Sequence, residues 1–117
     1  MKKEYNLDKR TLVFGREIVI FCKNIEQNII TIPLIKQLIR SGTSIGANYA
    51  EANGASSKKD FRNKIYICKK ESQETKYWLN IISTAVPSKN EEIKKLWQEA
   101  QELTLIFQKI TNSLRSS

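Results

Sequence analysis

Apolar residues recur at alternating steps of three and four along four segments of the chain. This spacing is typical of α-helices that keep one face toward neighbouring helices over several turns. The stripes are Phe14, Ile18, Phe21, Ile25 and Ile29; Ile35, Leu38, Gly42, Ile45, Tyr49 and Ala52; Phe61, Ile65, Cys68, Ser72, Thr75, Leu79 and Ile82; and Ile93, Leu96, Ala100, Leu103, Phe107, Ile110 and Leu114. Short connections between them predict one all-α domain over 1–117, an antiparallel up-down-up-down four-helix bundle.

Residues that cap or break helices place the ends of the four segments near 8–28, 32–53, 58–85 and 89–115. The candidate starts are Asp8 as an N-cap, Pro33 in a first turn, and two arrangements like capping boxes, Ser57 with Asp60 and Ser88 with Glu91. The candidate stops are Asn28, Asn53 with Gly54, and Pro87.

The first predicted helix is apolar on more than one side, because Leu12 and Val19 lie nearly opposite the stripe of Phe14 and Ile18. A helix that is apolar around much of its circumference is covered on more than one side. In so small a bundle another subunit is the simplest cover, although isolated exposed apolar residues are ordinary. We therefore expect a ring-like homo-oligomer. Its candidate interface residues are Leu12, Val19, Trp97, Leu105 and Ile106.

The second predicted helix holds Gly42 and Gly46 among several Ser and Ala residues. Each glycine inside a helix costs about 1 kcal/mol relative to alanine. Two of them indicate a close approach by the backbone of another helix, and this interpretation is favoured over a ligand site.

The charges are unevenly distributed along the chain. Twenty basic and twelve acidic side chains give a net charge of +8. Residues 36–76 hold nine basic and four acidic side chains, whereas residues 91–117 hold four of each. Such a balance favours an anionic partner, with a solubilising surface charge as the alternative.

The basic residues of the third helix form a line at steps of three and four. The candidate nucleic-acid-binding residues are Lys58, Lys59, Arg62, Tyr66, Lys69 and Lys76, together with Arg40 on the neighbouring helix. Cations neutralise phosphates, and a tyrosine among them can stack on a base. The alternative is a solvated helix face with local ion pairs.

Catalytic chemistry has little support in the composition. The chain contains no histidine, which excludes Ser-His and Cys-His nucleophiles and histidine metal ligands. Glu51, Glu71 and Glu74 would form an acid or metal site if they met across the second and third helices. A polar network that fixes helix register is the favoured interpretation. We expect no enzyme activity, no metal and no cofactor.

Cysteine usage and hydropathy bear on location. Cys22 and Cys68 lie on apolar stripes and are expected to be reduced packing residues, with a disulfide as the alternative. The longest aliphatic run, residues 18–22, is far shorter than the roughly 20 residues that span a bilayer. Charged residues interrupt the first segment, so no signal peptide is predicted. These features predict a cytoplasmic protein without membrane contact.

A family resemblance emerges from the middle of the chain. The segment 37–48 (QLIRSGTSIGAN) resembles the signature of the four-helix-bundle proteins first known from intervening sequences in bacterial 23S rRNA genes. Glu51-Ala52, 57–61 (SKKDF) and 71–79 (ESQETKYWL) extend the match in the expected order. Tyr49 departs from the pattern, since the family usually has an aliphatic residue there.

The resemblance implies an architecture and a set of partners. Proteins similar to this one form homopentameric rings of four-helix bundles. The family is related to accessory variability proteins of diversity-generating retroelements, which are basic pentamers that partner a reverse transcriptase and its RNA. We therefore expect a non-enzymatic oligomeric scaffold, a pentamer, that binds RNA or DNA through its basic face. The alternative is an adaptor that recognises a protein such as a reverse transcriptase.

Overall fold

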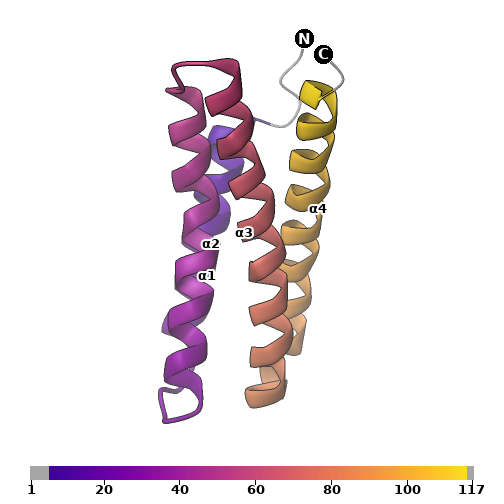
Figure 1. The fold of residues 1–117 in the computed structure, drawn as a ribbon. Coiled ribbons are helices and arrows are strands. Elements are labelled where there is room, and N and C mark those ends of the chain that lie inside the picture. Colours follow the sequence, from indigo (N-terminus) through magenta and orange to yellow (C-terminus); the bar gives the residue numbers. More distant parts are fainter. Residues whose placement is uncertain (1–5, 116–117) are drawn as a thin grey trace.

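The computed structural model describes residues 6–115, which form four α-helices, one 3₁₀ turn and no strand. The elements are α1 (Leu7–Lys23), α2 (Thr31–Asn53), α3 (Lys58–Ala85), the turn η1 (Pro87–Lys89) and α4 (Asn90–Arg115). The helices run alternately up and down in a rod of 47 × 22 × 21 Å (Figure 1). The predicted all-α four-helix bundle is confirmed.

The core follows the predicted stripes along the axis of the rod. The large side chains that are almost completely buried include Phe14, Ile18, Leu38, Ile45, Ile65, Leu79, Ile82, Leu103 and Phe107. Burying one such side chain contributes about 1.5–3 kcal/mol. These contacts fix the rotation of each helix, and they leave the basic side of α3 outside the core.

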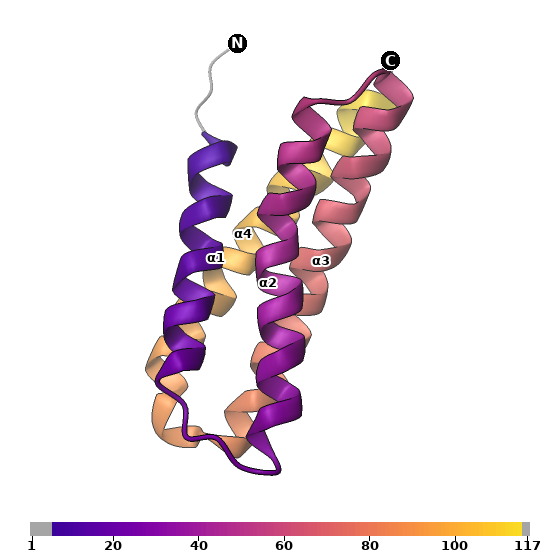
Figure 2. The same ribbon diagram turned by 90° about the vertical axis from the view of Figure 1, so that its left-hand side faces the viewer.

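The glycines of α2 lie where α1 packs beside it (Figure 2). A Cβ at Gly42 would lie 2.9 Å from Cγ1 of Ile18, and one at Gly46 would lie 3.2 Å from Oγ1 of Thr11. Side chains of α1 therefore occupy the space that larger residues would need. The predicted close approach by a helix backbone is met at Gly46, where the backbone oxygen of Thr11 would lie 3.4 Å from the added Cβ, whereas at Gly42 the three nearest atoms all belong to the Ile18 side chain.

The first helix is shorter than predicted, because α1 begins at Leu7 and ends at Lys23. Asp8 lies in its first turn and is not the N-cap, so that prediction is wrong. The predicted stop at Asn28 is also wrong, because its side chain accepts hydrogen bonds from the backbone N–H groups of Ile30 and Thr31 and so opens α2. Asparagine side chains compete in this way with the helix for the hydrogen bonds of the backbone. Ile29 leaves the predicted stripe and is 87% exposed.

The third helix starts as predicted, because Oγ of Ser57 accepts a hydrogen bond from the backbone N–H of Asp60. The fourth does not. Pro87 begins the turn η1, and α4 starts only at Asn90. Ser88 lies inside that turn and does not directly precede the first residue of α4, so the predicted capping box of Ser88 and Glu91 is wrong.

Candidate nucleic-acid interface

Five cationic side chains lie along α3, and we call them the basic row: Lys58, Lys59, Arg62, Lys69 and Lys76. Two members are tied to α4. Nζ of Lys69 donates a hydrogen bond to Oε1 of Gln108 at 2.7 Å, and Nζ of Lys76 donates to Oε1 of Gln101. Because these acceptors are neutral amides, they position the ammonium groups without cancelling their charge.

Aromatic rings accompany the same two lysines. Nζ of Lys69 lies 5.5 Å from the ring centroid of Tyr66, and Nζ of Lys76 lies 5.1 Å from that of Trp97. These distances are within the range of cation–π attraction. The structure thus brings Tyr66 into the basic row as predicted, and it adds Trp97 of α4 at the lower end.

The other end of the basic row surrounds a small hollow. Lys58, Lys59 and Arg62 line a cavity of about 280 Å³ together with Leu114 of α4. Nε of Arg62 is buried and has no hydrogen-bond acceptor within residues 6–115. The first turn of α3 adds the partial positive charge of a helix N-terminus. This end of α3 therefore concentrates positive charge.

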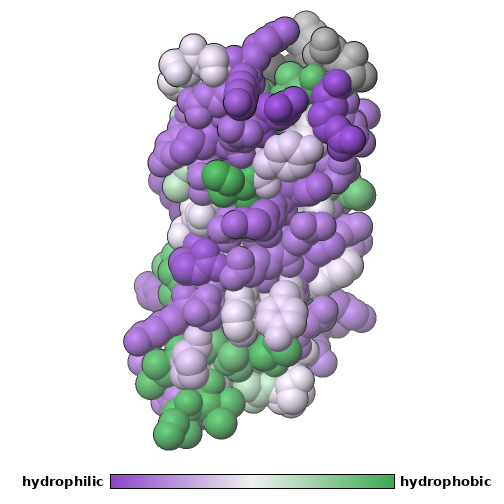
Figure 3. Space-filling view, in the orientation of Figure 1, coloured by the Kyte–Doolittle hydropathy of each residue, from purple (hydrophilic) through white to green (hydrophobic). Residues whose placement is uncertain are grey.

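The basic row lacks carboxylate partners among the described residues, in contrast to four other cations of the bundle. Ion pairs join α1 to α4, α2 to α3, and η1 to the start of α4: Arg10 with Glu99 and Glu102, Arg40 with Glu71 and Glu74, Lys64 with Glu51, and Lys89 with Glu92. No cation of the basic row forms an ion pair with a carboxylate in the described part of the chain. The face of the bundle on which α3 lies is largely hydrophilic (Figure 3).

Arg40 does not belong to this surface. Its guanidinium donates to Oε1 of Glu71 at 3.2 Å and also to Glu74. Burial lowers the pKa of Arg40, but the two carboxylates outweigh that effect and the pKa is raised. The prediction of Arg40 as a nucleic-acid contact stays a prediction, but two carboxylates compensate its charge on the α2 side of α3.

The acidic alternative is not assembled either. Glu71 and Glu74 share Arg40, whereas Glu51 accepts from Nζ of Lys64 at 2.7 Å. Ser41 and Thr75 link α2 to α3 through a buried hydroxyl hydrogen bond of 2.9 Å. Across residues 6–115 no group of three His, Cys, Asp or Glu side chains is arranged to hold a metal ion. The polar residues of this seam form the network that fixes register.

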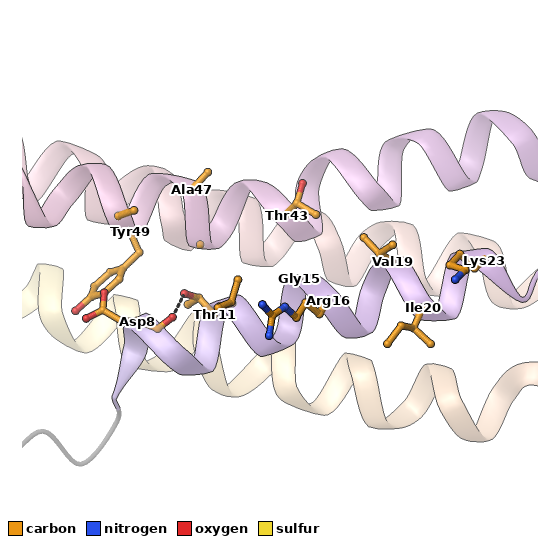
Figure 4. A pocket seen from close by; sticks show the side chains of 13 residues that line it. Asp8, Thr11, Gly15, Arg16, Val19, Ile20, Lys23, Thr43, Ala47 and Tyr49 are labelled. Atoms are coloured by element: carbon orange, nitrogen blue, oxygen red, sulfur yellow. Dashed lines mark hydrogen bonds between the residues drawn. The ribbon is translucent and has the colours of Figure 1, made fainter.

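Two of the interface candidates lie on the exposed apolar side of α1. Leu12 and Val19 are 51% and 37% exposed, and they line a groove of about 620 Å³ between α1 and α2 (Figure 4). Its floor contains the small residues Gly15, Gly46 and Ala47.

The interface candidates on α4 divide into three cases. Leu105 is exposed, as an interface residue must be in the single chain. Ile106 is only 7% exposed and packs in the core of its own bundle, so its prediction as an interface residue is wrong. Trp97 is half-buried and packs against that core beneath Lys76.

The structure also exposes apolar residues that the sequence reasoning missed. Ile29, Ile30 and Ile32 protrude from the α1–α2 connection at the lower end of the rod. Hydrogen bonds from Thr31 to the backbone carbonyl of Glu26, and to the Asn28 side chain, hold this connection in shape. Three isoleucines shortly after Asn24, which ends α1, and Asn28, which opens α2, were the available signal.

Both cysteines are free and buried. Burial raises the pKa of Cys22 to about 11 and that of Cys68 to about 12. Thiols of this kind stay protonated and unreactive at neutral pH. The prediction that they are packing residues without a disulfide is confirmed.

No helix in the described range is both long and apolar enough to cross a membrane.

The fold and this surface define a small basic four-helix bundle with a row of uncompensated cations along α3. Residues 3–114 match the family of 23S rRNA-intervening sequence proteins, and the chain belongs to that family. A crystal structure of a protein of unknown function from the S23 ribosomal protein family of Bacteroides thetaiotaomicron is similar, with 32% sequence identity and a TM-score of 0.80. The similarity covers 90% of this chain and 97% of the other. A comparison with curated proteins found no match.

Proposed function

We propose that this protein is a non-enzymatic, cytoplasmic helical scaffold whose basic row binds nucleic acid, with RNA as the preferred ligand. The observation that carries the proposal is a difference in the partners that hold the cations of the bundle. Arg10, Arg40 and Lys64 are compensated by carboxylates, whereas Lys69 and Lys76 are held by neutral amides. A fixed row of uncompensated charge releases condensed counterions when it meets phosphates. The family's association with 23S rRNA-intervening sequences agrees with an RNA ligand.

The test is a triple substitution that removes three of the five cations of the basic row and leaves the core residues unchanged. Lys59→Ala, Arg62→Ala and Lys69→Ala together should weaken binding of a labelled RNA duplex by about 10- to 100-fold at low salt, because three phosphate contacts are lost. Fluorescence anisotropy measures the affinity, and circular dichroism checks that both proteins are equally helical.

The matched control removes the same charge from elsewhere. Lys9, Lys36 and Lys95 are exposed cations on α1, α2 and α4. Replacing all three by Ala lowers the net charge by the same amount and should change the affinity by much less. Equal losses in the two variants would mean that net charge alone, and not the basic row, attracts RNA.

We propose further that the scaffold is a homo-oligomer, a ring of five copies, assembled through the apolar side of α1. The groove with Leu12 and Val19 supports this proposal, since it places exposed apolar side chains beside small residues, where a helix of another copy could pack. Leu105 of α4 is a further exposed candidate. A ring would repeat the basic row and strengthen its field.

Native mass spectrometry tests the assembly. The wild-type protein should give the mass of five chains, and Leu12→Glu with Val19→Glu should give single chains of unchanged helicity. A wild-type protein that stays monomeric at micromolar concentration would overturn the proposal of a ring. The basic row of the single chain would be unaffected by that result.

A second candidate function is an adaptor for a protein partner such as a reverse transcriptase. Ile29, Ile30 and Ile32 favour it, because they form an exposed apolar tip far from the start of α3. Replacing the three residues by Ser should abolish capture of such a partner while leaving the affinity for RNA duplex unchanged. Capture that survives the substitution would exclude this tip as the contact.

A further inference from the structure

A second groove lies between α3 and α4, next to the lower end of the basic row. Asn80 and Ser83 line it from α3, and Asn90, Lys94, Trp97 and Gln98 line it from α4. Its volume is about 630 Å³, within the range of pockets that accept small organic ligands. Within the groove, Oγ of Ser83 donates a hydrogen bond to the backbone carbonyl of Asn80 at 2.6 Å.

Trp97 forms the aromatic part of this groove. Its ring is half-buried against the core, and Nζ of Lys76 lies 5.1 Å from the ring centroid. Nε1 of the indole is buried and has no hydrogen-bond acceptor among residues 6–115. The buried indole donor of a tryptophan normally has a partner, so one without an acceptor is a feature to be explained. Because this nitrogen is shielded from solvent, the part of Trp97 that a ligand in the groove can contact is its ring.

The rim of the groove is polar in a particular way. Asn80, Asn90 and Gln98 are exposed, and each amide offers both a donor and an acceptor. Unpaired bases are recognised by hydrogen bonds to their edges and by stacking on aromatic rings. Lys94 on the rim and Lys76 above the indole supply positive charge for the adjoining phosphates.

We propose that this groove binds an unpaired base of a single-stranded nucleic acid whose backbone continues along the basic row. The inference rests on the proposed function and deepens it, because it names single strands as the preferred ligand. A base inside a duplex is stacked and paired on its neighbours and does not reach an indole between two helices. Lys76 joins the two surfaces, since it belongs to the basic row and covers Trp97.

The first experiment uses the protein's own fluorescence. The chain has two tryptophans, so Trp78→Phe leaves Trp97 as the only indole reporter. Titration with a ten-nucleotide oligouridine should quench this fluorescence. A duplex RNA of the same length should bind, as measured by anisotropy, and leave the indole emission unchanged. Quenching of equal depth by the duplex would overturn the inference.

The second experiment compares two pairs of exposed amides. Asn80→Ala with Gln98→Ala should weaken binding of the oligouridine by about tenfold, because the lost hydrogen bonds to the edge of a single base are together worth a factor of that order. Binding of the duplex should stay within about twofold, since phosphate contacts carry it. The control pair, Gln27→Ala with Asn63→Ala, removes two exposed amides outside the groove and should leave both affinities unchanged.

The outcomes separate the two proposals. If the oligouridine and the duplex both bind and the Asn80 and Gln98 variant matches the control, the groove is not a base site and only this inference fails. If neither RNA binds the wild-type protein, the proposed function fails, and the inference fails with it. Both proposals are supported if the Asn80 and Gln98 variant binds the oligouridine more weakly than the wild type does and the control variant does not.

Discussion

Replacing glycine by alanine at Gly42 and at Gly15 should change the stability of the bundle in opposite directions. Both residues are buried and lie in helix interiors, on α2 and α1 respectively. Alanine is more favourable than glycine in a helix by about 1 kcal/mol. That gain is common to both substitutions, so it cancels when the two variants are compared.

The surroundings of the added methyl group make the difference. At Gly15 the nearest heavy atom to a Cβ is Cα of Thr43 at 3.7 Å, an ordinary van der Waals contact. At Gly42 three atoms of Ile18 lie between 2.9 and 3.2 Å from the new Cβ. Ile18 is fully buried and branched at Cβ, so its side chain has little freedom to move away. Overpacking of this kind costs about 1–3 kcal/mol.

Urea unfolding followed by circular dichroism measures the gap. With a slope of about 1.5 kcal/mol per molar urea, a difference of roughly 2 kcal/mol separates the midpoints of Gly15→Ala and Gly42→Ala by more than 1 M. The two variants are compared at one protein concentration, because assembly would add to the apparent stability. A Gly42→Ala midpoint equal to or above that of Gly15→Ala would refute the assigned contact between α1 and α2.

Two further predictions concern buried polar groups. Arg40→Ala leaves the Glu71 carboxylate, which is 9% exposed, without its counter-ion; since the guanidinium itself is 46% exposed, we expect a loss of about 1–2 kcal/mol in urea unfolding and no change in RNA affinity. Adding Glu71→Gln should recover part of the loss, and no recovery would contradict the ion pair. The free energy of unfolding should fall as pH rises above 9, because the Cys22 and Cys68 thiols ionise there in the unfolded chain but only near pH 11 and 12 in the folded one. Replacing both by Ala should flatten that fall between pH 9 and 11, and an unchanged slope would contradict the burial of the thiols.

Periodicity alone predicted the long helices α2, α3 and α4, because their stripes continue over several turns and little else competes with them. The core residues Ile65, Leu79 and Phe107 lie where this spacing places them. The cap at Ser57 was also predictable, since it depends only on residues three positions apart.

The end of α1 was not predictable in the same way. The apolar spacing continues through Ile25 to Ile29, but the side chains of Asn24 and Asn28 take backbone partners that a longer helix would need. Asn24 donates to the carbonyl of Ile20, and Asn28 accepts from the N–H groups that open α2. Periodicity cannot indicate which of two local hydrogen-bond patterns is the more stable.

The candidate site was predicted in outline because one helix carries it. Steps of three and four placed the cations of the basic row on one side of α3 without knowledge of the tertiary structure. The ion pairs of Arg40 with Glu71 and Glu74 and the groove beside Trp97 were not predicted, and the two omissions share a cause. Both depend on which residues of a second helix lie opposite, and helix spacing within one segment does not give that register.

The salt dependence of RNA affinity tests the basic row most directly. The logarithm of the association constant should fall linearly with the logarithm of salt concentration, by about 0.7–0.9 for each phosphate contact. Lys59→Ala, Arg62→Ala and Lys69→Ala together should reduce that slope by roughly 2–3, whereas the Lys9, Lys36 and Lys95 variant should keep the slope of the wild type. A triple variant of the basic row that binds RNA with the wild-type slope would contradict the assignment of this surface.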